Sequence, residues 1–200
     1  DSSHSFIGGG SGNTISSYSK YSSILGGFNN VISASTDGSP GCVILGGFNN
    51  LAIKNTTASL VGGGDNTLGS LLGSSNYTFI FGRYNSGTSN GSVILGQANY
   101  FTGDSISVIG TSNILNSALF SIIGDSNIGT SSTNARKIII GSSNNVNISS
   151  GIVGAGIFGD SNSLLHSGSY LIGNGLTSTT ENTVFVPKLN IALSGTPSSS

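Results

Sequence analysis

Carboxylates are the side chains of this chain that could hydrolyse a glycosidic bond, and the sequence contains few of them. There are seven acidic residues among 200. A glycosidase needs two carboxyl groups about 5 Å apart for retaining chemistry, or about 6.5–9.5 Å apart for inverting chemistry. Asp125 and Asp160 occupy equivalent positions of an internal repeat, but two repeat units, and thus roughly 10 Å, separate them. We therefore predict that Asp125, Asp160, Asp65 and Asp104 cap turns, and that the chain has no catalytic residue and is not an enzyme.

Histidine and cysteine are equally sparse, so we predict no metal site and no cofactor. His4 and His166 have no cysteine or carboxylate at metal-ligand spacing. In a trimer His166 would face its symmetry mates, which leaves an axial ion as an alternative. Cys42 has no partner for an intrachain disulfide and is interpreted as a small buried filler. The glycine runs at 8–10 and 62–64 precede no helix and no lysine, unlike a phosphate loop.

Aromatic side chains at repeated turn positions are the residues best suited to recognition. Phe28, Phe48 and Tyr84 each lie two residues after a repeat glycine, and Tyr100 follows a repeat asparagine. Stacked repeats would align Phe28 and Phe48 about one strand spacing apart, in a strip on which sugar rings can stack. We predict these four residues as glycan or receptor contacts. The alternative, and the commoner role of such rings, is packing over turns or between chains.

An internal repeat must position all of these residues. Two or three apolar residues followed by Gly-x-x-Asn recur at short, nearly regular intervals, with the asparagine at 13, 29, 49, 66, 85, 99, 113, 127, 144 and 162. Chance does not produce so many phased copies. The residues predicted to form the turns are Gly26, Asn29, Gly46, Asn49, Gly96, Asn99, Gly110, Asn113, Gly124, Asn127, Gly141, Asn144, Gly159 and Asn162.

Each repeat is interpreted as one coil of a parallel β-solenoid, or β-roll. Glycine supplies backbone conformations closed to other residues, and asparagine tolerates the left-handed region. A coil this short cannot bury its own apolar face, so coils must stack, about 4.8 Å apart. We expect about eleven coils in a rod roughly 50 Å long. The asparagine and serine side chains of stacked turns should form ladders.

Composition agrees with an all-β fold and narrows the range of partners. Hydrophobic residues make up 36% of the chain and charged residues 6%, with 32 glycines. Six scattered basic residues cannot neutralise a nucleic-acid backbone. No apolar run approaches the roughly 18 residues of a membrane helix, so we expect neither nucleic-acid binding nor membrane insertion. The repeat is lost before Pro187, which predicts a solenoid domain over 1–178 and an extended linker strand over 179–200.

The residues before each turn bear on oligomeric state. Successive strand residues point to opposite faces, yet both residues are apolar in pairs such as Val108–Ile109 and Ile122–Ile123. One face can fill the solenoid, and the other needs a second cover. We expect neighbouring copies around an axis, in a homotrimer. A thick monomeric solenoid is the alternative.

The pattern also resembles known surface proteins. Ser-apolar-apolar-Gly with Gly/Asn/Ser turns at regular spacing resembles the head repeats of YadA-like trimeric autotransporter adhesins, which are trimers of parallel β-rolls. The Ile-Leu-Gly-Gly-Phe-Asn-Asn repeats at 24–30 and 44–50 look more like repeats in tail-fibre and virion-surface proteins of phages and large viruses. Residues 182–191 resemble the linker that precedes a downstream trimerisation or chaperone region in such fibres.

These resemblances imply an extracellular location, on a virion or a cell surface. The expected function is that of a non-enzymatic segment of a trimeric fibre, phage or viral, whose partners are its own copies and a host-surface glycan or protein. One alternative is the head of a bacterial trimeric adhesin. Another is a polysaccharide-degrading tailspike, which would need clustered acids that the sequence lacks.

Overall fold

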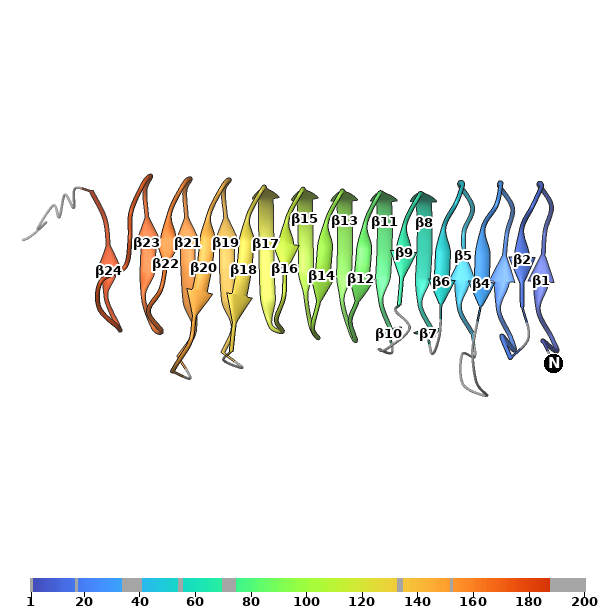
Figure 1. The fold of residues 1–200 in the computed structure, drawn as a ribbon, viewed down its shortest axis with the longest axis horizontal. Helices are drawn as coiled ribbons and strands as arrows, with labels where there is room; N and C mark the ends of the chain where they lie inside the picture. Colours follow the sequence, from blue (N-terminus) through green and yellow to red (C-terminus); the bar gives the residue numbers. More distant parts are fainter. Residues whose placement is uncertain are drawn as a thin grey trace, which may run out of the picture.

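The chain folds as an all-β parallel solenoid. The computed structural model describes residues 2–16, 18–33, 41–53, 56–69, 75–132, 135–151 and 153–187. Two long parallel sheets, here called sheet A and sheet B, run the length of the rod (Figure 1). Each coil adds one strand to sheet A, turns, adds one strand to sheet B, and returns. The fold class predicted from the repeat is therefore confirmed.

Within the described residues, sheet A has twelve strands and sheet B has ten, and the neighbours in sheet A pair in parallel. Their order is β1 (Phe6–Ile7), β3 (Ser23–Ile24), β5 (Val43–Ile44), β8 (Leu60–Gly64), β11 (Phe79–Arg83), β13 (Val93–Gln97), β15 (Ser107–Thr111), β17 (Phe120–Asp125), β19 (Lys137–Ile140), β21 (Ala155–Phe158), β23 (Tyr170–Ile172) and β24 (Val184–Phe185).

Sheet B has ten strands, also parallel. They are β2 (Thr14–Ile15), β4 (Val31–Ser33), β6 (Leu51–Ile53), β9 (Thr67–Leu68), β12 (Ser86–Thr88), β14 (Tyr100–Thr102), β16 (Ile114–Leu115), β18 (Ile128–Ser131), β20 (Asn145–Ile148) and β22 (Ser163–Leu164). A separate pair consists of β7 (Thr56–Thr57) and β10 (Ser75–Asn76).

The two edges of sheet A differ in construction. The strands of sheet A end at short glycine-containing turns that lead into sheet B, and we call this border the turn edge; it runs along the top in Figure 1. The opposite border, where the chain returns from sheet B, is the loop edge. Insertions between repeats fall at the loop edge, so the turn edge keeps a constant geometry from coil to coil.

The core lies between the sheets and is filled by inward residue columns from both sheets. Sheet A contributes side chains such as Ile94, Val108 and Ile122, and sheet B contributes Phe101 and Leu115, all at most 1% exposed. Burial of such a side chain stabilises the fold by about 1.5–3 kcal/mol. Because neighbouring strands pair without a shift, each inward residue stacks on its equivalent in the next coil.

The number of coils is slightly smaller than predicted. Ten coils in the described part of the chain contribute a strand to both sheets, against the expected eleven or so. The degenerate last repeat forms β23, but on the sheet B side it makes only an isolated bridge between Thr177 and Ser163. It lacks the apolar pair that would build a further sheet B strand.

The C-terminal segment adds to the solenoid beyond residue 178. Strand β24 pairs with β23, with Val184 opposite Tyr170 and Phe185 opposite Leu171. Residues 188–200 of the predicted linker lie outside the described residues. The described residues include no helix of the length and hydropathy that a membrane span requires.

Candidate functional site

A ladder of ten asparagines lines the inside of the turn edge. Its members are Asn13, Asn30, Asn50, Asn66, Asn85, Asn99, Asn113, Asn127, Asn144 and Asn162. All but the first, which lies in the end coil, are buried. The sequence predicted such ladders, and the structure supplies their bonding pattern.

Each rung of the ladder repeats the same set of hydrogen bonds. The backbone N–H and the Nδ2 of Asn113 both donate to Oδ1 of Asn99, at 3.1 and 2.9 Å. The Nδ2 of Asn113 also donates to the carbonyl oxygen of Gly124 in the following coil, at 2.8 Å. One side chain thus joins three successive coils. A buried amide with this many partners avoids the penalty of unsatisfied polar groups.

The ladder is shifted by one residue from the prediction in two coils. In the Gly-Gly-Phe-Asn-Asn turns the ladder members are Asn30 and Asn50, whereas Asn29 and Asn49 are exposed and have positive φ angles of 52° and 53°. These two turns contain one extra residue before the ladder position. The first asparagine takes the left-handed conformation, and the second continues the stack.

The repeat glycines allow adjacent turns to approach closely. Gly96 has φ of 139°, and a Cβ there would lie 1.8 Å from the carbonyl oxygen of Gly110 in the next coil. No other residue fits such a position. In the two Gly-Gly-Phe-Asn-Asn turns, the glycine in this column is the second one, Gly27 or Gly47, and not the predicted Gly26 or Gly46.

The carboxylates of the turn edge accept backbone amides, as predicted for caps. Oδ1 of Asp125 accepts the Thr111 N–H at 2.9 Å and the Thr111 hydroxyl at 2.7 Å. These two hydrogen bonds lower the pKa of Asp125, and the bond from the Thr111 hydroxyl contributes more than the bond from the Thr111 backbone N–H. Oδ1 of Asp160 accepts the Ser142 N–H at 2.7 Å. Each of these carboxylates therefore binds the preceding coil.

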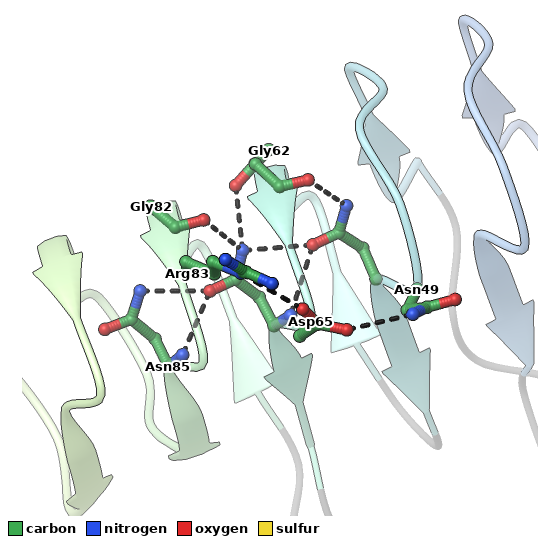
Figure 2. A network of polar contacts seen from close by, with 9 residues as sticks. Asn49, Gly62, Asp65, Gly82, Arg83 and Asn85 are labelled. Atoms are coloured by element: carbon green, nitrogen blue, oxygen red, sulfur yellow. Dashed lines mark hydrogen bonds and ion pairs between the residues drawn. The ribbon is translucent and has the colours of Figure 1, made fainter.

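Asp65 and Asp104 are also engaged in contacts between coils. Asp104 accepts the backbone N–H and the Nδ2 of Asn90 at 2.9 and 2.8 Å. Asp65 accepts Nδ2 of Asn49 and forms an ion pair with Nε of Arg83 at 3.3 Å (Figure 2). Hydrogen bonding of this kind accounts for the positions of all four carboxylates.

Three of the four predicted aromatic contacts gather at the turn edge. Phe28 and Phe48 are direct neighbours on adjacent coils, and they are 53% and 39% exposed. Tyr84 lies two coils beyond Phe48, and the Arg83 guanidinium carbon is 5.3 Å from the Phe48 ring centre and 4.5 Å from the Tyr84 ring centre. Arg83 thus bridges the rings, a role that no sequence pattern indicated.

A glycine creates the space for this arrangement. Gly64 lies between Phe48 and Arg83 in the register of the turn edge, and a Cβ at Gly64 would be 2.6 Å from the Phe48 ring. With Asp65 and Asn49 beside the rings, the turn edge here presents an exposed patch that is aromatic in the middle and polar at its border. We call Phe28, Phe48, Asp65, Arg83 and Tyr84 the aromatic patch.

Tyr100, the fourth predicted contact, lies elsewhere. It is on the outer face of sheet B, opposite Ser86 and Ile114, and 46% exposed. The sequence placed it next to a turn asparagine but could not show that this position begins the next strand. Tyr100 therefore lies apart from Phe28, Phe48 and Tyr84.

Cys42 and Lys137 occupy one inward column next to the loop edge. In the earlier coils this column consists of small polar residues such as Ser59, Thr78 and Ser92, and Cys42 is a fully buried member. Lys137 is 1% exposed, with Nζ 5.3 Å from the Phe120 ring centre, and burial lowers its pKa. The burial of Cys42 fits the small filler that the sequence predicted.

The histidines have separate local roles. His4 stacks on Tyr21 with ring centres 5.2 Å apart, and Nδ1 of His166 lies 3.0 Å from the carbonyl oxygen of Ser178. Among the described residues, no three side chains of histidine, cysteine, aspartate or glutamate gather where they could hold a metal ion.

The outer face of sheet A carries a continuous apolar column. Its members from β11 to β23 are paired in register without interruption, and they are Phe81, Leu95, Ile109, Ile123, Ile140, Phe158 and Ile172. Leu25 and Leu45 hold the equivalent position in earlier coils. The members from Ile109 to Ile172 are 40–52% exposed. Gly62 holds this position in β8 and interrupts the column, so at one strand spacing per coil the unbroken part from Phe81 to Ile172 is roughly 29 Å long.

A hollow of about 280 Å³ opens beside this column at the loop edge. Its lining comes from three successive coils and consists of Ser105, Leu119, Ser121, Arg136, Lys137 and Ile138. Ser121 points outward at the position that Ile138 holds in the next coil. Because the serine side chain is smaller than isoleucine, a depression forms there. The exposed Arg136 lies at its border.

Comparison with known proteins leaves the family open. No protein-family profile matches the chain, and no curated protein matches it significantly. The function must therefore be argued from the column, the aromatic patch and the turn edge themselves.

Proposed function

We propose that this chain is a non-enzymatic segment of an extracellular homotrimeric fibre that takes part in attachment to a host surface. Phage or viral tail fibres are the leading class, and the head of a bacterial trimeric adhesin is the alternative. Sheet A faces the fibre axis, and sheet B faces solvent. The turn edge holds the aromatic patch at the border between the axis-facing sheet A and the solvent-facing sheet B.

The observation that carries this proposal is the apolar column of sheet A. A contiguous apolar surface larger than a few hundred Å² is rare on a soluble monomer and typically marks an interaction site. This column follows every coil from β11 to β23, so its cover must also be elongated and parallel to the rod. Further copies of the same chain have that shape and the same repeat.

A polysaccharide-degrading spike is the third candidate, and the turn carboxylates argue against it. Asp125 and Asp160 each accept hydrogen bonds from a neighbouring coil, and Ser142 stands between them in the column. Neither carboxylate is buried, so neither has the apolar surroundings in which a glycosidase holds its general acid. Their structural role accounts for their positions.

The molecular mass in solution tests the assembly. One chain has a mass of 20.0 kDa, and a trimer has three times that mass. Sedimentation equilibrium of the whole chain over a range of concentrations is expected to give the mass of three chains. The mass of a single chain at all concentrations would overturn the trimer.

The attachment role is tested on the aromatic patch. Aromatic faces beside polar groups suit sugar rings, and a glycan array is expected to show binding that the double variant Phe28→Ser/Phe48→Ser loses. Tyr100→Ser is the matched control, because it removes an equally exposed ring from sheet B. Unchanged binding by the double variant would assign Phe28 and Phe48 to packing.

A further inference from the structure

Two charged residues, Arg136 and Asp160, lie at opposite edges of sheet A and at the same level of the rod. Within the part of the chain that the structure describes, Arg83 and Asp65 form an ion pair, but neither Arg136 nor Asp160 does. Arg136 immediately precedes β19 at the loop edge. The turn edge of the same coil begins at Gly141 and Ser142, just after β19 ends.

Asp160 belongs to the next coil but reaches back to this level. Its Oδ1 accepts the backbone N–H of Ser142 at 2.7 Å, so the carboxylate is held beside the end of the β19 coil. Asp160 is exposed, and its backbone N–H donates to Oδ1 of Asn174 on the opposite side. Asp125 differs, because its carboxylate reaches to Thr111, two coils before the β19 level.

The symmetry of a closed assembly brings these two edges together. When copies are related by rotation about an axis parallel to the rod, each strand of sheet A forms one side of the cross-section. The end of each sheet A strand in one copy then meets the start of the equivalent strand in the next copy. The turn edge of one copy therefore faces the loop edge of its neighbour. Rotation preserves height along the axis, which places the Asp160 carboxylate of one copy at the level of Arg136 in the next.

We propose that the Arg136 guanidinium of one copy binds the Asp160 carboxylate of the adjacent copy, and that the hollow at the loop edge receives the neighbouring turn. This inference rests on the trimer proposed above and adds its lateral contact and register. The hollow and Arg136 are adjacent to the apolar column, so the contact continues the same interface. The neighbour's turn at Gly159, Asp160 and Ser161 has small side chains that suit a 280 Å³ hollow.

A disulfide between the two positions tests this directly. Within one copy, the width of the sheet separates residue 136 from the turn edge by roughly 20 Å, whereas a disulfide needs Cα atoms within about 7 Å. Any bond between cysteines at 136 and 160 must therefore join two copies. The experiment uses the whole chain carrying Arg136→Cys and Asp160→Cys in a Cys42→Ser background, since Cys42 shares its buried column with Ser59.

Oxidation followed by non-reducing gel electrophoresis is expected to give a covalent trimer. The matched control, Arg136→Cys with Thr111→Cys, should crosslink at least tenfold less, because Thr111 lies at the same edge but two coils, roughly 10 Å, from the β19 level. A solution mass of three chains without a crosslinked product, or equal crosslinking by the control, would overturn the Arg136–Asp160 contact and leave the trimer standing. A covalent dimer as the final product would confirm the contact and overturn the threefold symmetry.

Charge exchange provides a second test that does not depend on oxidation. Arg136→Glu and Asp160→Arg each place like charges at the contact, so each is expected to raise the dissociation constant of the trimer about tenfold or more. The double variant should return it to within about threefold of the wild type. Failure of the double variant to recover, while both single variants remain folded by circular dichroism, would contradict the pairing.

Discussion

The outer faces of the two sheets differ in polarity although both arise from the same repeat. On sheet A the outward column is apolar from Phe81 to Ile172 without a break. On sheet B the aligned column alternates between polar and apolar stretches, and its members in order are Thr14, Val31, Leu51, Thr67, Ser86, Tyr100, Ile114, Ile128, Asn145 and Ser163. Inward residues of both sheets are buried along the rod.

The difference shows which surface is under constraint. Most inward residues are apolar because they fill the core. An outward residue is free to be polar unless something covers it, so a sheet with one solvated face alternates between apolar and polar residues. Sheet B, with polar and apolar stretches, has the composition of a face that is only partly covered, whereas sheet A from β11 to β23 has that of a sheet covered on both sides. The comparison therefore favours sheet A for the proposed contact between copies.

The largest expected effect comes from placing charge on each face in turn. Ile109→Lys/Ile123→Lys puts two charges on sheet A, and Ile114→Lys/Ile128→Lys puts them on sheet B, in the same two coils and at similar exposure. The first variant is expected to lose the trimer and sediment with the mass of a single chain. The second is expected to keep the wild-type mass, because its lysines remain in water.

The outcome distinguishes the faces clearly. Both variants should keep a β-rich circular dichroism spectrum, since neither alters an inward residue. Loss of assembly in the sheet B variant alone would reverse the assignment of the two faces. Loss in neither would refute a trimer held by these residues.

A smaller effect is expected at the turn edge, where the two sheets join. Asn30→Ala removes the Oδ1 that accepts the backbone N–H and the Nδ2 of Asn50 at 3.1 and 3.0 Å. Leaving buried donors unsatisfied is expected to lower the free energy of unfolding by about 1–3 kcal/mol. The measurement is denaturant unfolding followed by circular dichroism.

The adjacent residue supplies the control for this variant. Asn29→Gly changes an exposed asparagine with positive φ to a residue that accepts that conformation, so its effect should be within about 0.5 kcal/mol. Equal destabilisation by both variants would show that the ladder is not at the second asparagine. Because the ladder lies where the two sheets join, Asn30→Ala should lower the free energy of unfolding of the solenoid as a whole and not of one sheet alone.

The smallest effect is expected from the titration of Asp125. Its pKa is lowered from the ordinary 3.8 by hydrogen bonds to Thr111. The stabilisation is therefore present above pH 3.8 and is lost as the pH falls through the lowered value. Asp125→Asn keeps an acceptor oxygen but cannot titrate, so its melting temperature should fall less than that of the wild type between about pH 5 and about pH 2. Identical pH profiles would show that this carboxylate does not contribute.

The sequence predicted the coils well because each one repeats the same local chemistry. The Gly-x-x-Asn period located the turns, and the paired apolar residues located the strands of sheet A. The ladder position was wrong by one residue at Asn29 and Asn49, since two adjacent asparagines are equivalent in sequence and differ only in backbone conformation. Tyr100 was misplaced for a related reason, because the end of a turn and the start of a strand carry similar residues.

The repeat pattern alone is enough to predict a stacked parallel solenoid, because coils this short can bury their apolar residues only by stacking. The same pattern shows that two apolar residues precede most of the turns. The three-dimensional fold is needed to show which of them remain exposed, that Arg83 bridges Phe48 and Tyr84, and that Asp160 reaches back to the coil of Ser142. These contacts depend on the register between coils, which brings together residues that lie far apart in the chain.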